Sequence, residues 1–364
     1  MKILESYQLG ALALSNRVVM APMTRSRARA DGVPGDLAAL YYTQRSSMGL
    51  IISEAINISE GAKGVPNTPG LYTMDQIEGW YEVTSAVHAQ GGLIYAQLWH
   101  TGRAGHSSAR AGVPGVAPSA IRIEGQQSFT RDGPMDFEVP HALTIEEIKT
   151  VISDYRVAAM NARIAGFDGV ELHAAFGYLP NQFLVDAANQ RTDSYGGSID
   201  NRVRFTLEVL QALMEVWGER RVGIKLSPSN TYNGMTDSDP EALYKHLITA
   251  LNKLPLAYLQ LMQPLFPLDE FPDWPKDTVA TYARFFAGTV IANGGYTRET
   301  AGEEIQSGRT DLVAFGTLAL ANPDLPVRFD RGGPFNEADR ATLYAGGTDK
   351  GYTDYPALSA KGDS

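Results

Sequence analysis

Two side chains that can donate hydrogen bonds or move protons, His173 and Tyr178, stand close together in a short stretch of the chain. His173 ends an apolar run at residues 169–173, and Gly177 breaks the pattern that follows. A short apolar run that ends at a glycine predicts a buried strand entering a loop. The strand would fix the backbone of these residues, and the loop would let their side chains reach a ligand. We therefore take His173 and Tyr178 as the candidate catalytic pair.

The elements that position this pair follow a regular rhythm. Apolar runs predict eight strands, at residues 17–23, 50–55, 93–98, 169–173, 222–226, 258–262, 289–292 and 312–315. Helical spacing appears between them, most clearly at residues 75–89, 144–165, 199–217 and 240–251. Thr144 and Glu147 predict a capping box at the start of the longest helix. Eight strand–helix units predict an α/β fold, a closed (β/α)8 TIM barrel.

An open, doubly wound sheet is the competing fold. It would need a glycine-rich turn after the first strand, but Pro22, Met23 and Thr24 stand there. We therefore expect one TIM-barrel domain over residues 1–364, with a hairpin cap at residues 1–14. Residues 101–142, rich in Gly, Ser and Pro, predict a lid-like insertion after the third strand. Residues 361–364 predict a flexible tail.

Composition narrows the class of protein. Apolar residues make up 44% of the 364 residues and charged residues 20%, which suits a large core. The net charge is −10, and there is no basic run, so nucleic acid and anionic membranes are poor partners. The absence of cysteine excludes disulfides and thiolate chemistry. With no signal-peptide pattern and no long apolar stretch, we expect a cytoplasmic monomer or homodimer that acts on a small molecule.

Residues at the other strand ends suit a flat heteroaromatic ligand that carries a phosphate. The amide of Gln97 can pair with a ring edge, Thr24 offers a hydroxyl, and Lys225 offers a positive charge. Trp99 and Tyr178 could form the walls of the pocket. Backbone N–H groups near the ends of the last two strands could hold the phosphate, from Asn293, Gly294, Gly295 and Gly316. Each of these residues alone could instead be explained by packing or by a turn. Their positions at the ends of successive strands favour a ligand site.

Other site types fit less well. His100 and His173 lie on different strands without carboxylates at ligand spacing, so we expect no metal site. Glu54 and Glu171 could form a glycosidase pair, but each is offset from the strand end by one position. We interpret both as packed structural carboxylates.

Several longer motifs resemble the old yellow enzymes, a family of flavin-dependent ene-reductases. The matching segments are NRVVMAPMTR at 16–25, GLIISEA at 49–55, QLWHTGR at 97–103, GYL at 177–179, NQRTDSYGGS at 189–198, ANPDL at 321–325 and GYTDYP at 351–356. The resemblance implies a barrel that binds FMN non-covalently. It also implies NAD(P)H as the reductant and an alkene activated by a carbonyl or nitro group as the substrate.

The resemblance also implies roles for individual residues. His173 would donate to the activating oxygen of the substrate, and Tyr178 would deliver a proton to its α-carbon. Trp99 and Tyr352 would line the pocket. The implied flavin contacts are Pro22, Thr24, Ala55 and Gln97.

Four positions depart from the family pattern. Phe176 stands where a second His or Asn would grip the activating oxygen, and Val65 replaces an aromatic residue over the pocket. Lys225 replaces an arginine against the flavin, and Thr317 replaces an arginine in the phosphate site. The first two changes predict an altered substrate scope, and the last two predict weaker FMN binding.

Three functions are compatible with this pattern. The preferred one is an FMN-dependent NAD(P)H oxidoreductase of activated alkenes with altered scope, because Thr24 and Gln97 are present. The first alternative is an isomerase or cyclase on the same fold, with weak or no flavin binding, in which His173 and Tyr178 act as an acid/base pair. The second is a non-catalytic ligand-binding protein.

Overall fold

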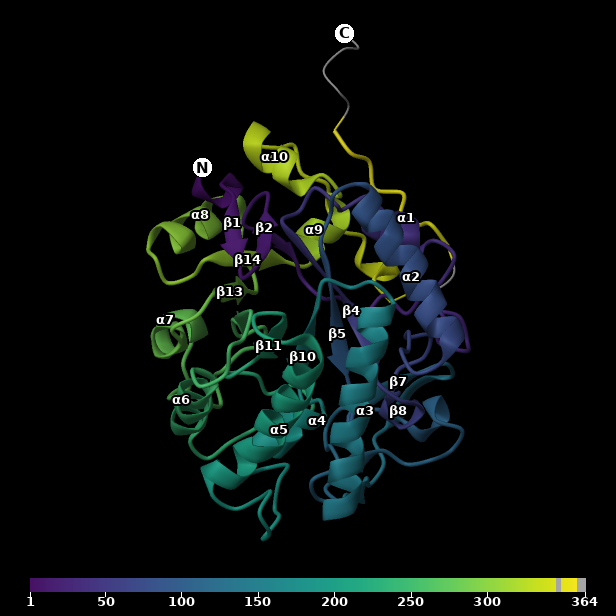
Figure 1. Cartoon of the computed structure of the whole chain (residues 1–364). Helices are drawn as coiled ribbons and strands as arrows, with labels where there is room; N and C mark the ends of the chain where they lie inside the picture. Colours follow the sequence, from purple (N-terminus) through teal and green to yellow (C-terminus); the bar gives the residue numbers. More distant parts are fainter. Residues whose placement is uncertain (345–347, 359–364) are drawn as a thin grey trace.

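Eight parallel strands close into a barrel in the computed structural model, which describes residues 1–344 and 348–358. Around the barrel the strands follow chain order (Figure 1): β3 (Val18–Met20), β4 (Leu50–Asn57), β5 (Ile94–Trp99), β10 (Gly169–Ala174), β11 (Val222–Leu226), β12 (Tyr258–Met262), β13 (Val290–Asn293) and β14 (Leu312–Phe315). All eight predicted strands and the TIM-barrel fold are confirmed. The predicted tail at 361–364 lies outside the described residues.

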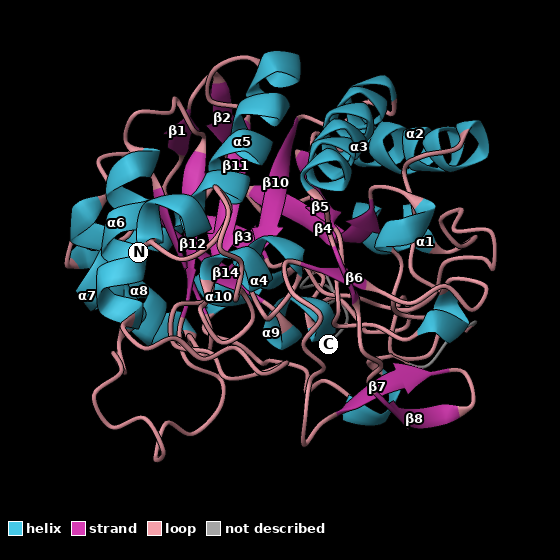
Figure 2. Cartoon of the chain, turned by 90° about the horizontal axis from the view of Figure 1, so that it is seen from below, coloured by secondary structure: helices cyan, strands magenta, loops and turns pink. Residues whose placement is uncertain are grey.

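Helices lie outside the strands (Figure 2). They are α1 (Ala38–Thr43), α2 (Met74–Ala89), α3 (Ile145–Ile164), α4 (Leu179–Leu184), α5 (Ile199–Trp217), α6 (Pro240–Leu251), α7 (Thr278–Tyr282), α8 (Arg298–Gln306), α9 (Thr317–Ala321) and α10 (Leu325–Arg331). Short 3₁₀ turns occur at Lys2–Leu4, Glu60–Ala62, Ser107–Ala109, Ala283–Phe285 and Arg340–Thr342. The predicted Thr144–Glu147 capping box starts α3, where both reciprocal hydrogen bonds form. Among the described helices, none combines the length and the apolar character that a bilayer span needs.

A hairpin of β1 (Tyr7–Leu9) and β2 (Leu12–Leu14) closes the amino-terminal end of the barrel, as predicted. Leu9, Leu12 and Leu14 are buried in one apolar cluster with Val19 and Ile52 from the barrel strands. The cluster also contains Leu50, Tyr95, Tyr258, Ile291 and Leu312. This end is therefore packed with side chains, and any ligand site must lie at the opposite end.

The insertion after β5 has some structure of its own. It contains β6 (Val116–Ala117), β7 (Gln127–Thr130), β8 (Gly133–Asp136) and β9 (His141–Ala142). β7 and β8 form an antiparallel ribbon that projects from the barrel, and β6 pairs with β9 (Figure 2). Its role as a lid stays a prediction.

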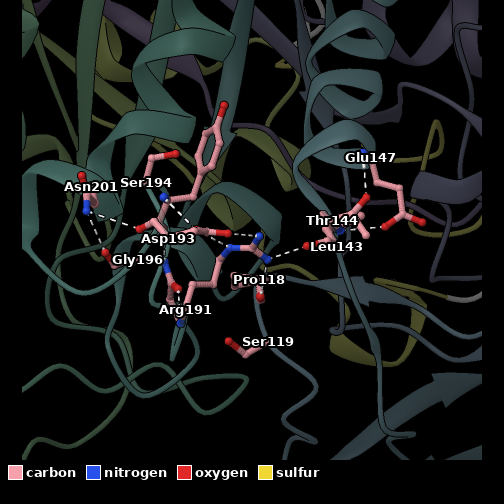
Figure 3. Close-up of polar contacts among 12 residues, drawn as sticks. Pro118, Ser119, Leu143, Thr144, Glu147, Arg191, Asp193, Ser194, Gly196 and Asn201 are labelled. Atoms are coloured by element: carbon pink, nitrogen blue, oxygen red, sulfur yellow. Dashed lines mark hydrogen bonds and ion pairs between the residues drawn. The ribbon is translucent and has the colours of Figure 1, made fainter.

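Arg191, within the NQRTDSYGGS segment, ties this insertion to the barrel (Figure 3). Its Nη1 donates to the carbonyl oxygens of Pro118 (2.9 Å) and Leu143 (2.5 Å). Asp193 pairs with the same guanidinium and fixes its orientation. The long polar motif thus ties the insertion to the segment that precedes α5.

Candidate active site

A chain of hydrogen-bonded side chains crosses four strands near the carboxyl end of the barrel. Glu171 on β10 accepts from Gln97 Nε2 on β5 (2.8 Å) and from Gln260 Nε2 on β12 (2.7 Å). Gln260 Oε1 in turn accepts from Asn293 Nδ2 on β13 (2.6 Å). We call these four residues the glutamate relay. All four are buried, and burial raises the pKa of Glu171 to about 7.

The relay fixes the amide of Gln97 in one orientation. Because Nε2 donates to Glu171, the carbonyl oxygen Oε1 is left without a donor among the described residues. Ala55 on β4 is the register partner of Gln97 across a local irregularity between Ile52 and Ala55. The predicted flavin contacts Ala55 and Gln97 are therefore neighbours. Glu171, interpreted from the sequence as a structural carboxylate, orients the Gln97 amide.

His173 lies two residues beyond Glu171, with its Nδ1 buried and without a partner among the described residues. Burial lowers the pKa of His173 well below its usual value, and the nearby Lys225 charge lowers it further. The imidazole is therefore neutral and can offer one N–H. The Tyr178 ring lies edge-on to it, with 4.8 Å between ring centroids. The structure thus brings the predicted catalytic pair together.

The loop after β10 has an unusual backbone at Phe176, where φ is +55°. A bulky residue rarely adopts this left-handed conformation, which asparagine tolerates better. Side chains from other loops hold it in place: Ser227 Oγ accepts from the Phe176 N–H (2.9 Å), and Asn233 Nδ2 donates to the Phe176 carbonyl (2.8 Å). The ring of Phe176 is consequently fixed beside His173, with 6.3 Å between centroids.

Tyr178 contacts both the candidate site and the insertion after β5. Its ring packs against Ala104, Ile123 and Phe137 of the insertion and lies edge-on to Trp99, with 5.0 Å between centroids. Burial raises the pKa of Tyr178, so the phenol keeps its proton at neutral pH. Trp99 Nε1 is buried without a partner among the described residues.

Lys225 stands beside His173. The two residues are register partners on adjacent parallel strands, β11 and β10, so their side chains project to the same side of the barrel. The Lys225 ammonium lies 5.2 Å from the centroid of the Phe176 ring. Burial lowers the pKa of Lys225 to about 8, and the Glu171 carboxylate opposes this shift.

The predicted phosphate residues gather at the ends of β13 and β14. Asn293, which ends β13, is the register partner of Ala314 on β14, so the loops that begin at Gly294 and Gly316 are adjacent. Gly294 and Gly295 both have positive φ values, which expose backbone N–H groups as glycine allows. Thr317 is exposed at the start of α9.

In the loops after β13 and β14, no lysine or arginine takes the place of the arginine that Thr317 replaces. Neither loop segment, 294–297 or 316–321, contains lysine or arginine. The next arginine, Arg298, donates its Nε to the Phe329 carbonyl (2.6 Å) and pairs with Glu299. The predicted phosphate site is therefore built from backbone and hydroxyl groups.

The remaining predicted residues differ in their exposure and neighbours. Pro22 and Thr24 follow β3 and are partly exposed, and Val65 is half-buried in the loop before α2. Tyr352 has other neighbours: it stacks on Tyr41, with 4.1 Å between centroids, and lies under the Arg27 guanidinium. Tyr352 also lines a cavity of about 520 Å³ with Ser26, Arg27 and Asn67. Within the described residues, its aromatic contacts do not include His173 or Tyr178.

Sequence reasoning missed Gln260, and it did not assign to Ser227 the hydrogen bond that it accepts from the Phe176 N–H. Gln260 sits within an otherwise apolar strand, and an amide buried in such a strand is a signal of an interior polar contact. Glu54 agrees with its structural interpretation, since it accepts from the Arg25 N–H and from the Tyr42 hydroxyl.

Comparison with known proteins adds independent information. The model of a family described as NADH:flavin oxidoreductase / NADH oxidase matches residues 2–336. The chain is 45% identical over 358 residues to 12-oxophytodienoate reductase 1 of Oryza sativa subsp. japonica, covering 98% of this chain and 93% of the relative. It is 42% identical over 363 residues to a probable flavin mononucleotide-dependent alkene reductase of Leishmania infantum, covering 98% and 97%. The structure of morphinone reductase in complex with tetrahydroNAD superposes with a TM-score of 0.93 at 46% identity, covering 100% and 99%.

Proposed function

The chain belongs to the NADH:flavin oxidoreductase / NADH oxidase family, the old yellow enzymes, and from this premise we propose that it is an FMN-dependent reductase of activated alkenes. NAD(P)H is the proposed reductant, and the alkene carries a carbonyl or nitro group. The observation that carries the proposal is the pairing of His173 and Tyr178. A buried, unpartnered imidazole nitrogen lies beside a protonated phenol at the open end of a barrel.

The residues present fit FMN. Because Gln97 Nε2 donates to Glu171, Oε1 of the same amide points away from Glu171. This oxygen can accept a hydrogen bond from the edge of the flavin ring. Lys225, the register partner of His173 on the neighbouring strand, adds a positive charge at the same end of the barrel. The two glycines after β13, with positive φ, form a backbone cradle of the kind that holds phosphates in barrels.

The chemistry divides between the cofactor and the protein. Bound FMN would supply the redox chemistry, the transfer of hydride from NAD(P)H to the β-carbon of the alkene. His173 donates its N–H to the activating oxygen, where negative charge develops. Its low pKa means that it donates a hydrogen bond and does not transfer a proton.

Tyr178 supplies the proton to the α-carbon. Burial raises its pKa, so the phenol is fully protonated when the substrate binds. A weak acid is sufficient here because the accepting carbon becomes basic as charge develops. The insertion residues packed on Tyr178 restrict water around this proton transfer.

Substrate scope is set by Phe176. A ring replaces a hydrogen-bond donor beside His173, and removing one donor from an oxyanion site typically costs about 3 kcal/mol. We therefore propose that simple neutral enones are poor substrates.

One experiment tests the proposed function. The purified protein is titrated with FMN and followed by its visible spectrum, and NADPH or NADH is then added without oxygen. FMN should bind and then bleach, and a nitroalkene should restore its colour. A protein that takes up no FMN contradicts the proposal and favours the non-redox isomerase, the cyclase or the ligand-binding protein. Bound FMN that does not bleach leaves the flavin without a redox role.

A further inference from the structure

The loop after β11 contacts both the insertion and the loop that carries Phe176, and Asn233 takes part in both contacts. Its side-chain Nδ2 donates to the carbonyl oxygen of Phe176 (2.8 Å). Its backbone N–H donates to Oε1 of Gln126 (2.9 Å), which lies in the insertion just before β7. Asn233 is only 3% exposed, so water is a poor substitute for either partner.

A second contact fixes the same loop to the insertion. Arg103, near the start of the insertion, donates from Nη1 to the Ile121 carbonyl (2.9 Å) and from Nη2 to the Gly234 carbonyl (3.3 Å). Its Nη2 also lies 3.5 Å from the Asn233 carbonyl oxygen. The guanidinium therefore holds the insertion and the loop after β11 in one relative position.

The loop after β11 also packs directly on the residue that follows Phe176. A Cβ added at Gly177 would lie 2.5 Å from the Cβ of Asn233 and 3.1 Å from the carbonyl oxygen of Tyr232, so the two loops are in close contact. Phe176 and Asn233 both have left-handed backbones, with φ of +55° and +61°. Asparagine tolerates this conformation, whereas phenylalanine adopts it only where its surroundings hold it.

We propose that Asn233 is a positioning residue for Phe176, and that it makes the place of the Phe176 ring depend on the insertion. While Gln126 and Arg103 hold the loop after β11, Asn233 holds the Phe176 carbonyl, and the ring stays beside His173. When these contacts open, the left-handed backbone of Phe176 loses an anchor and can relax. The insertion thereby determines the shape of the site through Asn233.

The consequence for specificity rests on the proposed alkene reduction. His173 is the proposed donor to the activating oxygen, and the Phe176 ring lies 6.3 Å from the imidazole between centroids. A ring that is fixed there limits the room for the substituent on the carbon that bears this oxygen. The site should therefore accept a methyl ketone more readily than a phenyl ketone of the same alkene, and release of the ring should reduce this difference.

Hydrogen–deuterium exchange tests the link to the insertion without turnover. The Phe176 N–H donates to Ser227 Oγ and the Gly177 N–H donates to Asn181 Oδ1, so exchange of these amides reports opening of the loop. The purified protein is measured with FMN added. Gln126→Leu should speed this exchange by roughly fivefold to tenfold, as expected for the loss of one hydrogen bond.

Matched variants show whether the effect follows the proposed contacts. Gln126→Glu keeps an oxygen acceptor and should stay close to wild type. Gln127→Leu changes the exposed neighbour, whose amide pairs with Asp136, and should also stay close to wild type. Asn233→Gly keeps the left-handed backbone but removes the donor, so it should speed exchange at least as much as Gln126→Leu. Wild-type exchange in both Gln126→Leu and Asn233→Gly overturns the proposal, and faster exchange in Asn233→Gly alone overturns the link to the insertion.

A kinetic comparison shows whether Asn233 acts through the ring. Benzalacetone and chalcone share one alkene but carry methyl or phenyl on the carbonyl carbon. Asn233→Gly should raise the chalcone-to-benzalacetone ratio of kcat/KM by roughly threefold to tenfold. Flavin reduction by NAD(P)H should stay within about twofold of wild type.

The same comparison without the ring separates positioning from general loosening. Phe176→Gly removes the ring and tolerates the positive φ. In this background Asn233→Gly should leave the ratio unchanged, because nothing remains for Asn233 to position. A shift that persists without the ring contradicts the positioning role.

The outcomes separate this inference from the proposed function. FMN that fails to bind, or to bleach with NAD(P)H, refutes the proposed function, and the exchange measurements still decide the link. Normal bleaching, with loop exchange that does not respond to Gln126→Leu, refutes this inference alone.

Discussion

The glutamate relay and the region where β10 passes into its loop are close in the chain but differ in how their polar groups are satisfied. In the relay, both carboxylate oxygens of Glu171 are occupied, and the amides of Gln97 and Gln260 each have a protein partner. Where β10 and β11 end, His173 Nδ1 has no partner among the described residues, and the Lys225 ammonium faces the Phe176 ring of the loop. The comparison indicates that the relay is a framework and that the loop is where a ligand completes the structure.

Breaking the relay should have the largest effect. Glu171→Leu leaves two buried amides without an acceptor, and each unpaired group costs about 1–3 kcal/mol. We expect a loss of roughly 2–6 kcal/mol in the free energy of unfolding, measured with urea on the apoprotein, together with loss of FMN binding. Glu171→Gln, which keeps the shape and one acceptor, is the control and should lose less. Equal stability of Glu171→Leu and wild type would mean that the relay is not a framework.

Removing the proton donor should affect one half-reaction only. Tyr178→Phe should slow reoxidation of the reduced flavin by an alkene by about 10²-fold or more, because the α-carbon loses its acid. Reduction by NAD(P)H should stay within about twofold of wild type, since Tyr178 plays no part in it. Stopped-flow absorbance measures both steps, and Tyr81→Phe on the exposed face of α2 is the matched control. Equal slowing of both steps would count against the assignment.

Adding a neutral donor to the loop should have a moderate effect. Phe176→His should raise turnover of a simple enone by roughly tenfold to a hundredfold, because the new donor recovers part of the about 3 kcal/mol that a missing oxyanion donor costs. Phe176→Leu removes the ring without adding a donor and should give no gain. Steady-state kcat/KM for the enone measures the effect. No gain from Phe176→His would indicate that the pocket is shaped for another ligand.

The smallest predicted effect lies at the phosphate end. Because residues 294–297 and 316–321 contain no cation, the protein should discriminate poorly between FMN and riboflavin. Thr317→Arg should increase the preference for FMN by about tenfold, as expected for one charge-assisted contact. Flavin titration of the apoprotein measures both affinities, with Thr150→Arg on the exposed side of α3 as the control. A wild-type protein that already rejects riboflavin would show that backbone groups suffice.

Local patterns predicted most of the fold. Apolar runs bounded by glycine or proline located every barrel strand, and helical spacing with caps located α2, α3, α5 and α6. The short helices α1, α4, α7, α9 and α10 were not located, because five to seven residues give too few turns for a periodic signal, and α8 has only nine residues. Strand ends likewise located the candidate site, since barrel chemistry gathers there.

What could not be predicted depends on contacts between distant residues. The contact of the Lys225 ammonium with the Phe176 ring requires the register of β10 against β11 and the backbone angle at Phe176. The role of Gln260 requires knowing that its side chain meets Glu171 inside the barrel. The stacking of Tyr352 on Tyr41 requires the path of the carboxy-terminal segment. None of these relationships leaves a periodic trace in the sequence.

The two half-reactions of the FMN-loaded protein test the central claim most directly. NADPH or NADH, added without oxygen, should bleach the flavin, and a subsequent nitroalkene should restore its colour while the C=C bond is reduced. Product analysis should show one saturated nitroalkane for each nicotinamide consumed. A protein that binds FMN and bleaches but is reoxidised by no activated alkene would contradict the account of His173 and Tyr178.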